Sequence, residues 1–127
     1  MANRTAPHAK LVAQIRKRLG REPDLTLYLN TKGRLKNIGG QHAYVAEPAL
    51  TTGSSDLVGM FSLPLPHFVR SFATWFCLEV KTGEAVLTPE QELFRGLVLR
   101  RGGFFAVVRS EDDAVSALTR AREGKQE

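Results

Sequence analysis

The chain has 127 residues, 43% of them hydrophobic, and a net charge of +5 at neutral pH. This length and composition predict one domain over residues 1–127, with its core at about residues 8–122. The single cysteine, Cys77, excludes an internal disulfide framework and a cysteine-rich zinc site. No apolar run approaches the length of a membrane span, and the first residues contain no apolar signal segment. We therefore expect a soluble, cytoplasmic protein without a membrane partner.

Basic residues are concentrated in the N-terminal third of the chain. Residues 1–46 contain nine Lys and Arg against two acidic residues, a balance of +7, whereas residues 47–127 contain nine against eleven. A cationic region of this kind favours contact with a phosphate backbone, although a basic helix face can equally be a solvated surface. The candidate DNA-binding residues are Lys10, Arg16, Lys17, Lys32, Arg34 and Lys36.

The predicted elements begin with a helix over residues 7–19, whose apolar residues recur every three or four positions. A half-buried strand follows at 25–30, where apolar and polar residues alternate. Residues 31–55 are rich in Gly, Thr and Ser, and they predict a long mobile loop that could lie along a DNA backbone. Two further strands are predicted near 56–62 and 74–81.

The apolar segment 63–72 separates those two strands. Pro66 could open a short helix there, with Phe68, Val69 and Phe72 on one face. Such a segment either packs on its own sheet or contacts a partner, and we favour self-packing.

Three elements complete the predicted fold: a helix from Pro89 to about Arg101, a buried strand at 104–108, and a helix at 111–122. The tail from Gly124 is expected to fray. The order α-β-β-β-α-β-α predicts an α/β fold with a mixed sheet flanked by helices. The apolar stripe expected on the first of these helices consists of Leu93, Phe94, Leu97 and Val98.

Two acidic residues and a lysine form the most informative pattern in the chain. Glu79 and Lys81 stand two positions apart on a predicted strand, so they project to one face while Val80 points into the core. Asp56 follows a Gly-Ser-Ser turn at the start of the preceding strand, and pairing of the two strands would bring the carboxylates together. Carboxylate oxygens suit Mg²⁺ or Mn²⁺, and a lysine supports the attacking water or the phosphate charge. A weak, solvated ion pair is the alternative interpretation.

Gln91 permits two interpretations. Thr88 and Gln91 have the spacing of a capping box, in which the glutamine side chain bonds back to the backbone of the cap residue. A role in an active site is compatible with capping, but the cap is the safer assumption.

The order of elements, with an acid on the second strand and Glu-x-Lys on the third, resembles the PD-(D/E)XK nuclease superfamily. Within it, four segments are similar to the VRR-NUC family, and the likeness covers roughly residues 8–118. These segments read GSSDLVG at 53–59, LEVKTG at 78–83, TPEQ at 88–91 and GGFFAVVRS at 102–110.

The resemblance implies a restriction-endonuclease-like α-β-β-β-α-β core with an extra C-terminal helix. It implies that Asp56, Glu79 and the backbone carbonyl of Val80 hold Mg²⁺ or Mn²⁺, that Lys81 is the catalytic lysine, and that Gln91 assists in the active site. Small stand-alone members are associated with homodimers that cut branched DNA such as Holliday junctions. We therefore expect DNA, branched or duplex, as the partner and a homodimer as the assembly.

One position departs from the family pattern. Family members usually carry a glutamate early in the first helix, facing the metal site, and His8 stands at the corresponding position here. His8 could replace the glutamate as a ligand, but the sequence favours a solvated residue near the helix start.

The segment 107–110, Val-Val-Arg-Ser, corresponds to the segment for which the family is named.

Three functions remain open from the sequence. The leading hypothesis is a metal-dependent, structure-specific endodeoxyribonuclease. The alternative, motivated by His8, is a nucleic-acid-binding module with the same fold and weak or absent catalysis. An RNA-directed nuclease is less favoured, because the aromatic residues are expected mostly in the core rather than on the surface. These aromatic residues are Phe61, Trp75, Phe76, Phe94, Phe104 and Phe105.

Overall fold

The computed structural model describes residues 6–64 and 71–127, without the side chains of residues 32–38 and 42–46. Nine elements follow one another along these residues. They are α1 (Ala6–Leu19), β1 (Leu25–Leu29), β2 (Lys32–Ile38), β3 (Gln41–Glu47), β4 (Leu57–Pro64), β5 (Ser71–Val80), α2 (Pro89–Arg100), β6 (Phe104–Val108) and α3 (Glu111–Arg122).

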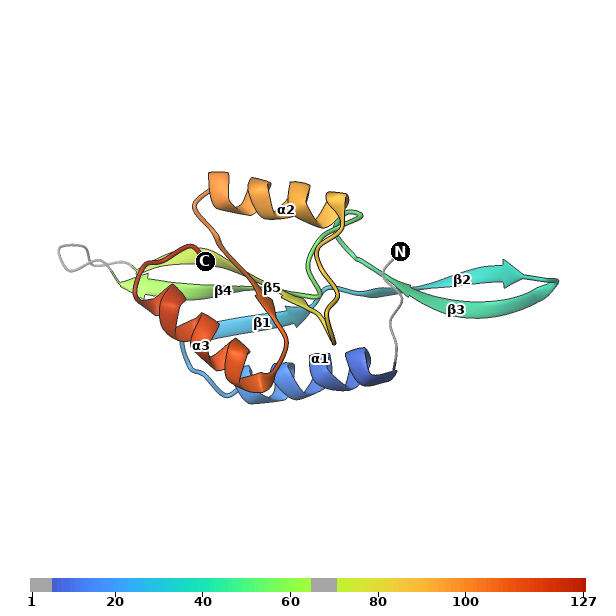
Figure 1. Ribbon diagram of the computed structural model, residues 1–127, viewed down its shortest axis with the longest axis horizontal. Coiled ribbons are helices and arrows are strands. Elements are labelled where there is room, and N and C mark those ends of the chain that lie inside the picture. Colours follow the sequence, from blue (N-terminus) through green and yellow to red (C-terminus); the bar gives the residue numbers. More distant parts are fainter. Residues whose placement is uncertain (1–5, 65–70) are drawn as a thin grey trace.

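The main sheet has four strands in the order β1-β4-β5-β6. The pairs β1–β4 and β4–β5 are antiparallel, whereas β5 and β6 are parallel and are joined by α2. Helix α2 covers one face of this sheet, and α1 and α3 cover the other (Figure 1). Apart from β2 and β3, which form a separate two-stranded sheet, the elements follow the predicted order α-β-β-β-α-β-α, and the fold is a mixed α/β sheet flanked by helices.

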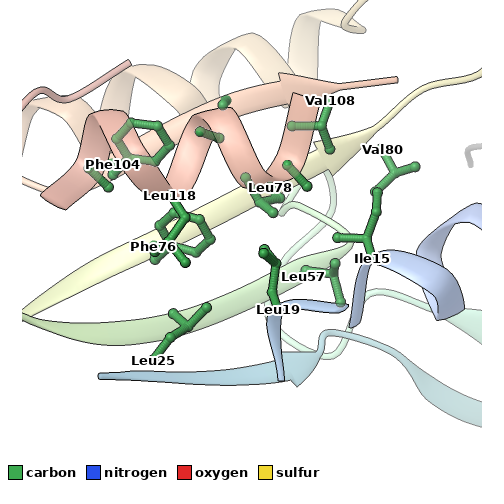
Figure 2. Packing of buried hydrophobic residues seen from close by; sticks show 14 of the residues in the cluster. Ile15, Leu19, Leu25, Leu57, Phe76, Leu78, Val80, Phe104, Val108 and Leu118 are labelled. Carbon is green, nitrogen blue, oxygen red and sulfur yellow. The ribbon is translucent and has the colours of Figure 1, made fainter. Parts of the chain in front are cut away.

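The larger core lies between the sheet and the pair α1/α3. Alternation along β5 sends Phe76, Leu78 and Val80 to this side, as predicted for Val80, and there they meet apolar residues of both helices (Figure 2). The ring of Phe76 stacks on Phe104 of the adjacent strand with a centroid separation of 5.2 Å. Each buried side chain of this size contributes about 1.5–3 kcal/mol to folding, so this layer holds the strands in register.

A smaller core lies under α2 and consists of Cys77, Phe94, Val98 and Phe105. Cys77 is fully buried, and burial raises the pKa of its thiol to about 12, so it is no nucleophile. Because Cys77 faces α2, Glu79, two positions further along the strand, faces the same helix.

The predicted loop at residues 31–55 is wrong for most of its length, because β2 and β3 form an antiparallel hairpin. Ile38 pairs with Gln41 across Gly39 and Gly40, whose φ angles are 58° and 82°. Two consecutive positive φ angles define the turn that suits a two-residue hairpin, and glycine adopts them without strain. The Gly-Gly pair was therefore a turn signal within two strands rather than a sign of a loop.

Other predictions about the periphery need correction. Ser71 and Phe72 belong to β5 and not to a helix, while residues 65–70, which contain the rest of the short helix predicted from Pro66, lie outside the described residues. Leu93 and Leu97 were predicted in the core but are 75% and 44% exposed, because α2 turns Phe94 and Val98 toward the sheet. Trp75, also predicted in the core, is 51% exposed.

The C-terminal tail does not fray as predicted. The backbone N–H of Phe105 donates to the carbonyl of Gln126 across 2.9 Å, so the tail covers the free edge of β6. The side-chain amide of Gln126 donates to the carbonyl of Leu99 in the last turn of α2, and Arg95 pairs with Glu127.

In the described part of the chain, no helix has the length and apolar character needed to cross a membrane.

Candidate active site

The residues singled out by the sequence pattern meet at one end of the main sheet. Asp56 directly precedes β4, and Glu79 is the next-to-last residue of β5. Because Leu57 pairs with Leu78 in antiparallel register, Asp56 comes opposite Glu79. The N–H of Val80 donates to Oδ2 of Asp56 across 2.9 Å, which fixes one carboxylate against the strand that carries the other. The predicted meeting of the two carboxylates is thus observed.

A buried asparagine positions the turn that carries Asp56. The side-chain amide of Asn30 donates to Oγ of Ser54 at 2.7 Å and to the carbonyl of Ser55 at 2.8 Å, and its Oδ1 accepts from the N–H of Leu50 at 3.1 Å. Its own N–H donates to the carbonyl of Asp56 at 2.9 Å. Asn30 therefore joins the end of β1 to the turn before β4. Sequence reasoning missed this residue, because an asparagine at a strand end gives no distinctive pattern.

Gln91 links the lysine to the second carboxylate. Its Oε1 accepts a hydrogen bond from Nζ of Lys81 at 2.8 Å, and its Nε2 donates to Oε1 of Glu79 at 3.0 Å. Lys81 Nζ itself lies 3.7 Å from that carboxylate oxygen. All three side chains are buried, so their mutual orientation is fixed by these bonds and not by solvent.

Gln91 is also part of the cap of α2. Its backbone N–H donates to Oγ1 of Thr88 at 3.2 Å, and its Oε1 accepts from the N–H of Thr88 at 2.9 Å. The capping box predicted from the sequence is confirmed, and the same amide oxygen also bonds Lys81. The cap and the site are therefore one structural unit.

Arg109 holds the loop between Lys81 and α2. Its guanidinium donates to the carbonyl of Gly83 at 2.9 Å and to that of Ala85 at 2.7 Å. The N–H of Lys81 donates to the carbonyl of Val108 at 3.0 Å, so the end of β6 also anchors the lysine backbone. The segment 107–110 thus positions one side of the site, a role that the sequence pattern did not specify.

The electrostatics of the site favour an added positive charge. Burial, together with the nearby Asp56 carboxylate, raises the pKa of the Glu79 carboxyl to about 8, although the Lys81 ammonium group acts in the opposite direction. Two buried carboxyls thus share one ammonium group. A cation placed between the carboxyls would relieve this imbalance.

The available donor atoms fit a hard divalent ion. Asp56 and Glu79 provide carboxylate oxygens, and Val80, the residue after Glu79, provides a backbone carbonyl. Among the described residues, no group of three or more His, Cys, Asp or Glu side chains is placed to hold a metal. Mg²⁺ in enzymes commonly uses one or two carboxylates and completes its shell with water and substrate, so the smaller donor set is sufficient.

His8 is the clearest correction to the predicted site. It was expected to be solvated, but it is buried, and its Nε2 lies 3.0 Å from the carbonyl oxygen of Val80 and 3.4 Å from Oδ2 of Asp56. The cause is the packing of α1, whose Val12 and Ile15 enter the larger core and turn position 8 toward the end of β5. The buried stripe of α1 consists of positions 8, 12, 15 and 19, and the polar histidine at its first position hides that periodicity in the sequence.

The candidate DNA-binding residues fall on two elements. Lys10, Arg16 and Lys17 are exposed on α1. Lys32, Arg34 and Lys36 belong to β2, and their side chains lie outside the described part of the structure. The hairpin formed by β2 and β3 extends beyond the sheet on the side where α1 and α2 begin, which is the side of the candidate site (Figure 1).

A separate apolar cavity of about 530 Å³ lies between α2 and the sheet. Trp75, Leu97 and Arg101 are among its lining residues, whereas Asp56, Glu79 and Lys81 are not. The cavity is therefore distinct from the acidic cluster.

Comparison of the chain with protein-family models, with curated proteins and with solved structures gave no match in any of the three.

Proposed function

We propose that this chain is a divalent-metal-dependent nuclease that hydrolyses phosphodiester bonds in DNA, with the restriction-endonuclease-like core that its motifs resemble. The observation that carries the proposal is the buried set Asp56, Glu79, Lys81 and Gln91 at one end of the sheet. A solvated ion pair, the alternative for Glu79 and Lys81, does not fit residues that are only 2% and 8% exposed.

The burial of these groups is itself an argument for function. Removing charged groups from water destabilises the folded state unless each is well paired, and replacing such a set with apolar residues often stabilises a protein. Perturbed carboxyl pKa values in buried clusters are characteristic of catalytic sites. The raised pKa of Glu79 follows that pattern.

Each residue has a chemical task in this proposal. A bound Mg²⁺ or Mn²⁺ would supply Lewis-acid activation of the scissile phosphate and of a water molecule. Asp56, Glu79 and the Val80 carbonyl would hold that ion. Lys81 places a positive charge beside Glu79, where it can orient the nucleophilic water or neutralise phosphate charge, and Gln91 keeps its ammonium group in place.

The basic N-terminal third supports a nucleic acid as the substrate. Lys10 lies within one helical turn of His8 on α1 but on a different, exposed face, so it places positive charge at the end of the helix nearest the site. The hairpin from β2 to β3 carries Lys32, Arg34 and Lys36 in its sequence and extends past the same end of the sheet (Figure 1). Branched DNA such as a Holliday junction, cut by a homodimer, is the substrate that we propose.

A cleavage assay tests the function directly. Labelled duplex, flap and four-way-junction DNA are incubated with Mg²⁺, Mn²⁺ or EDTA, using the parent chain, Glu79→Gln and Lys81→Met. The parent should cut only with metal, and each site variant should lose about 100- to 1,000-fold in rate. Glu84→Gln and Lys125→Met are matched controls, because both residues are exposed, and they should cut like the parent. Cutting in EDTA, or full activity of both site variants, would reject the proposal.

A binding module without catalysis is the second candidate. The observation that favours it is His8, whose Nε2 lies against the Val80 carbonyl, one of the oxygens proposed to hold the metal. Such a protein would bind junction DNA with a steep salt dependence and cut nothing under any metal. The two functions are therefore separated by the same assay.

A further inference from the structure

His8 brings a nitrogen donor into the proposed metal site. Its Nε2 lies 3.0 Å from the Val80 carbonyl oxygen and 3.4 Å from Oδ2 of Asp56, so three potential donor atoms from α1, β5 and the turn before β4 converge. The side chain is buried and belongs to a helix that the core fixes through Val12 and Ile15. This convergence does not depend on a mobile surface residue.

The spacing of the three atoms suits ligands of a single cation. Adjacent ligands of an octahedral ion with bonds of about 2.0–2.1 Å are separated by about 3 Å, and those of a tetrahedral ion by slightly more. The separations of 3.0 and 3.4 Å measured from Nε2 fall in this range. Small movements of the side chains would therefore suffice to place all three donors around one ion.

We propose that His8 is a direct nitrogen ligand of the metal, and that it makes the site selective for a first-row transition ion such as Mn²⁺ over Mg²⁺. This inference rests on the proposed function and specifies its cofactor. Imidazole binds first-row transition ions well, whereas Mg²⁺ prefers an all-oxygen shell and gives up water reluctantly. A site with Asp56, the Val80 carbonyl and His8 would combine one nitrogen donor with oxygen donors.

The rival role for His8 is purely structural, with its ring only donating a hydrogen bond to Val80. His8→Gln separates the two roles. The glutamine amide can still donate to the carbonyl of Val80, so it preserves a structural contact, but it offers no nitrogen lone pair to a metal. A structural role is rescued by this variant, and a ligand role is not.

Mn²⁺ bound to the full chain is the probe, and pulsed electron paramagnetic resonance measures nitrogen coupling to it. The parent should show coupling to an imidazole nitrogen, and His8→Gln should lose it. The matched control replaces the other two histidines together, His42→Gln with His67→Gln, and it should keep the signal. Because this control assigns the nitrogen by elimination, the test holds even if His8→Gln folds poorly.

Calorimetric titration with Mn²⁺ and with Mg²⁺ measures the selectivity. The ratio of Mg²⁺ to Mn²⁺ dissociation constants should fall by about 10- to 100-fold in His8→Gln, since loss of a ligand should matter at least as much as loss of an outer-shell partner. Tight Mn²⁺ binding without nitrogen coupling, or an unchanged ratio, would overturn the role of His8 and leave the nuclease intact. Absence of binding of either ion to the parent, or metal binding that is unchanged in Asp56→Asn, would overturn both.

Discussion

Gln91 donates a hydrogen bond from Nε2 to Oε1 of Glu79 across 3.0 Å, from the first turn of α2 to the end of β5. The same side chain accepts from Lys81 and from the backbone of Thr88. One residue therefore fixes the start of a helix and the relative orientation of a carboxyl and an ammonium group. Thr88 takes part only in the cap, whereas Gln91 also contacts Glu79 and Lys81, so substitutions at the two positions can be compared.

Thr88→Ala and Gln91→Ala should separate these two roles. Each removes part of the capping box and should destabilise the fold by about 1 kcal/mol. Only Gln91→Ala also frees Glu79 and Lys81, so its cleavage rate should fall by about 10- to 100-fold, while Thr88→Ala stays within a few-fold of the parent. Urea unfolding and single-turnover cleavage measure the two effects. Equal losses of activity in the two variants would show that the cap, and not the contact with Glu79, matters.

Glu79 should make the metal-free protein less stable as the pH rises. Burial, followed by the charge of Asp56, raises the pKa of this carboxyl from 4.5 to about 8 in the folded chain. Between those values the folded state holds a proton that the unfolded state has lost, so the free energy of unfolding falls as pH increases through this window. Thermal unfolding in EDTA from pH 4.5 to 8.5 should show the decline, and Glu79→Gln should flatten it. A parent and a variant with parallel curves would contradict the assignment.

Asn30→Ala should disturb the site from a distance. The substitution leaves the carbonyl of Ser55 and the N–H of Leu50 without the bonds that Asn30 provides, at a cost of about 2–3 kcal/mol. The turn before Asp56 should loosen, so Mn²⁺ affinity should decrease in calorimetric titration. Thr26→Ala, at an exposed position on the same strand, is the control and should change neither quantity appreciably. If Asn30→Ala is destabilised but its metal affinity is unchanged, Asn30 contributes to the stability of the fold and not to metal binding.

Gly53→Ala should be far more harmful than Gly83→Ala, although both glycines have positive φ. A Cβ at Gly53 would meet the backbone carbon and oxygen of Glu90 at 2.5 Å, whereas nothing lies within 4 Å of a Cβ at Gly83. Strain alone should cost about 1 kcal/mol at Gly83, and the clash should raise the cost at Gly53 to about 2–4 kcal/mol. Chemical denaturation of the two variants provides the comparison. Similar losses would mean that the N-terminus of α2 can move away from the turn.

Neutralising the exposed basic residues of α1 should weaken DNA binding in a salt-dependent way. If Lys10, Arg16 and Lys17 each neutralise one phosphate, replacing any of them should make the slope of log affinity against log salt shallower by about 0.9. Fluorescence anisotropy on junction DNA at several salt concentrations measures the slope for the variants with glutamine at these positions. Lys125→Gln, at an exposed position after α3, should keep the parental slope. Unchanged slopes for all three variants would move the DNA-binding surface to another part of the molecule.

The sequence alone predicted the elements that depend on local patterns. The spacing of Thr88 and Gln91 predicted the capping box of α2, and the alternation along β5 predicted that Val80 enters the core. The hairpin was missed because its glycines and charged residues weaken the alternation that identifies strands. The exposure of Leu93 and Leu97 was missed because periodicity gives an apolar stripe but not its width.

The chemistry of the candidate site was determined by the sequence, since Asp56, Glu79 and Lys81 are the groups that meet there. Only the tertiary structure decided how they are held. The side chains of Asn30, Arg109 and His8 bond to residues that stand 20 to 72 positions away along the chain, and no local pattern specifies bonds across such separations. Long-range packing of α1 on the sheet placed His8 beside Val80 and Asp56, because the core fixes the rotation of the helix and with it every side chain on that face.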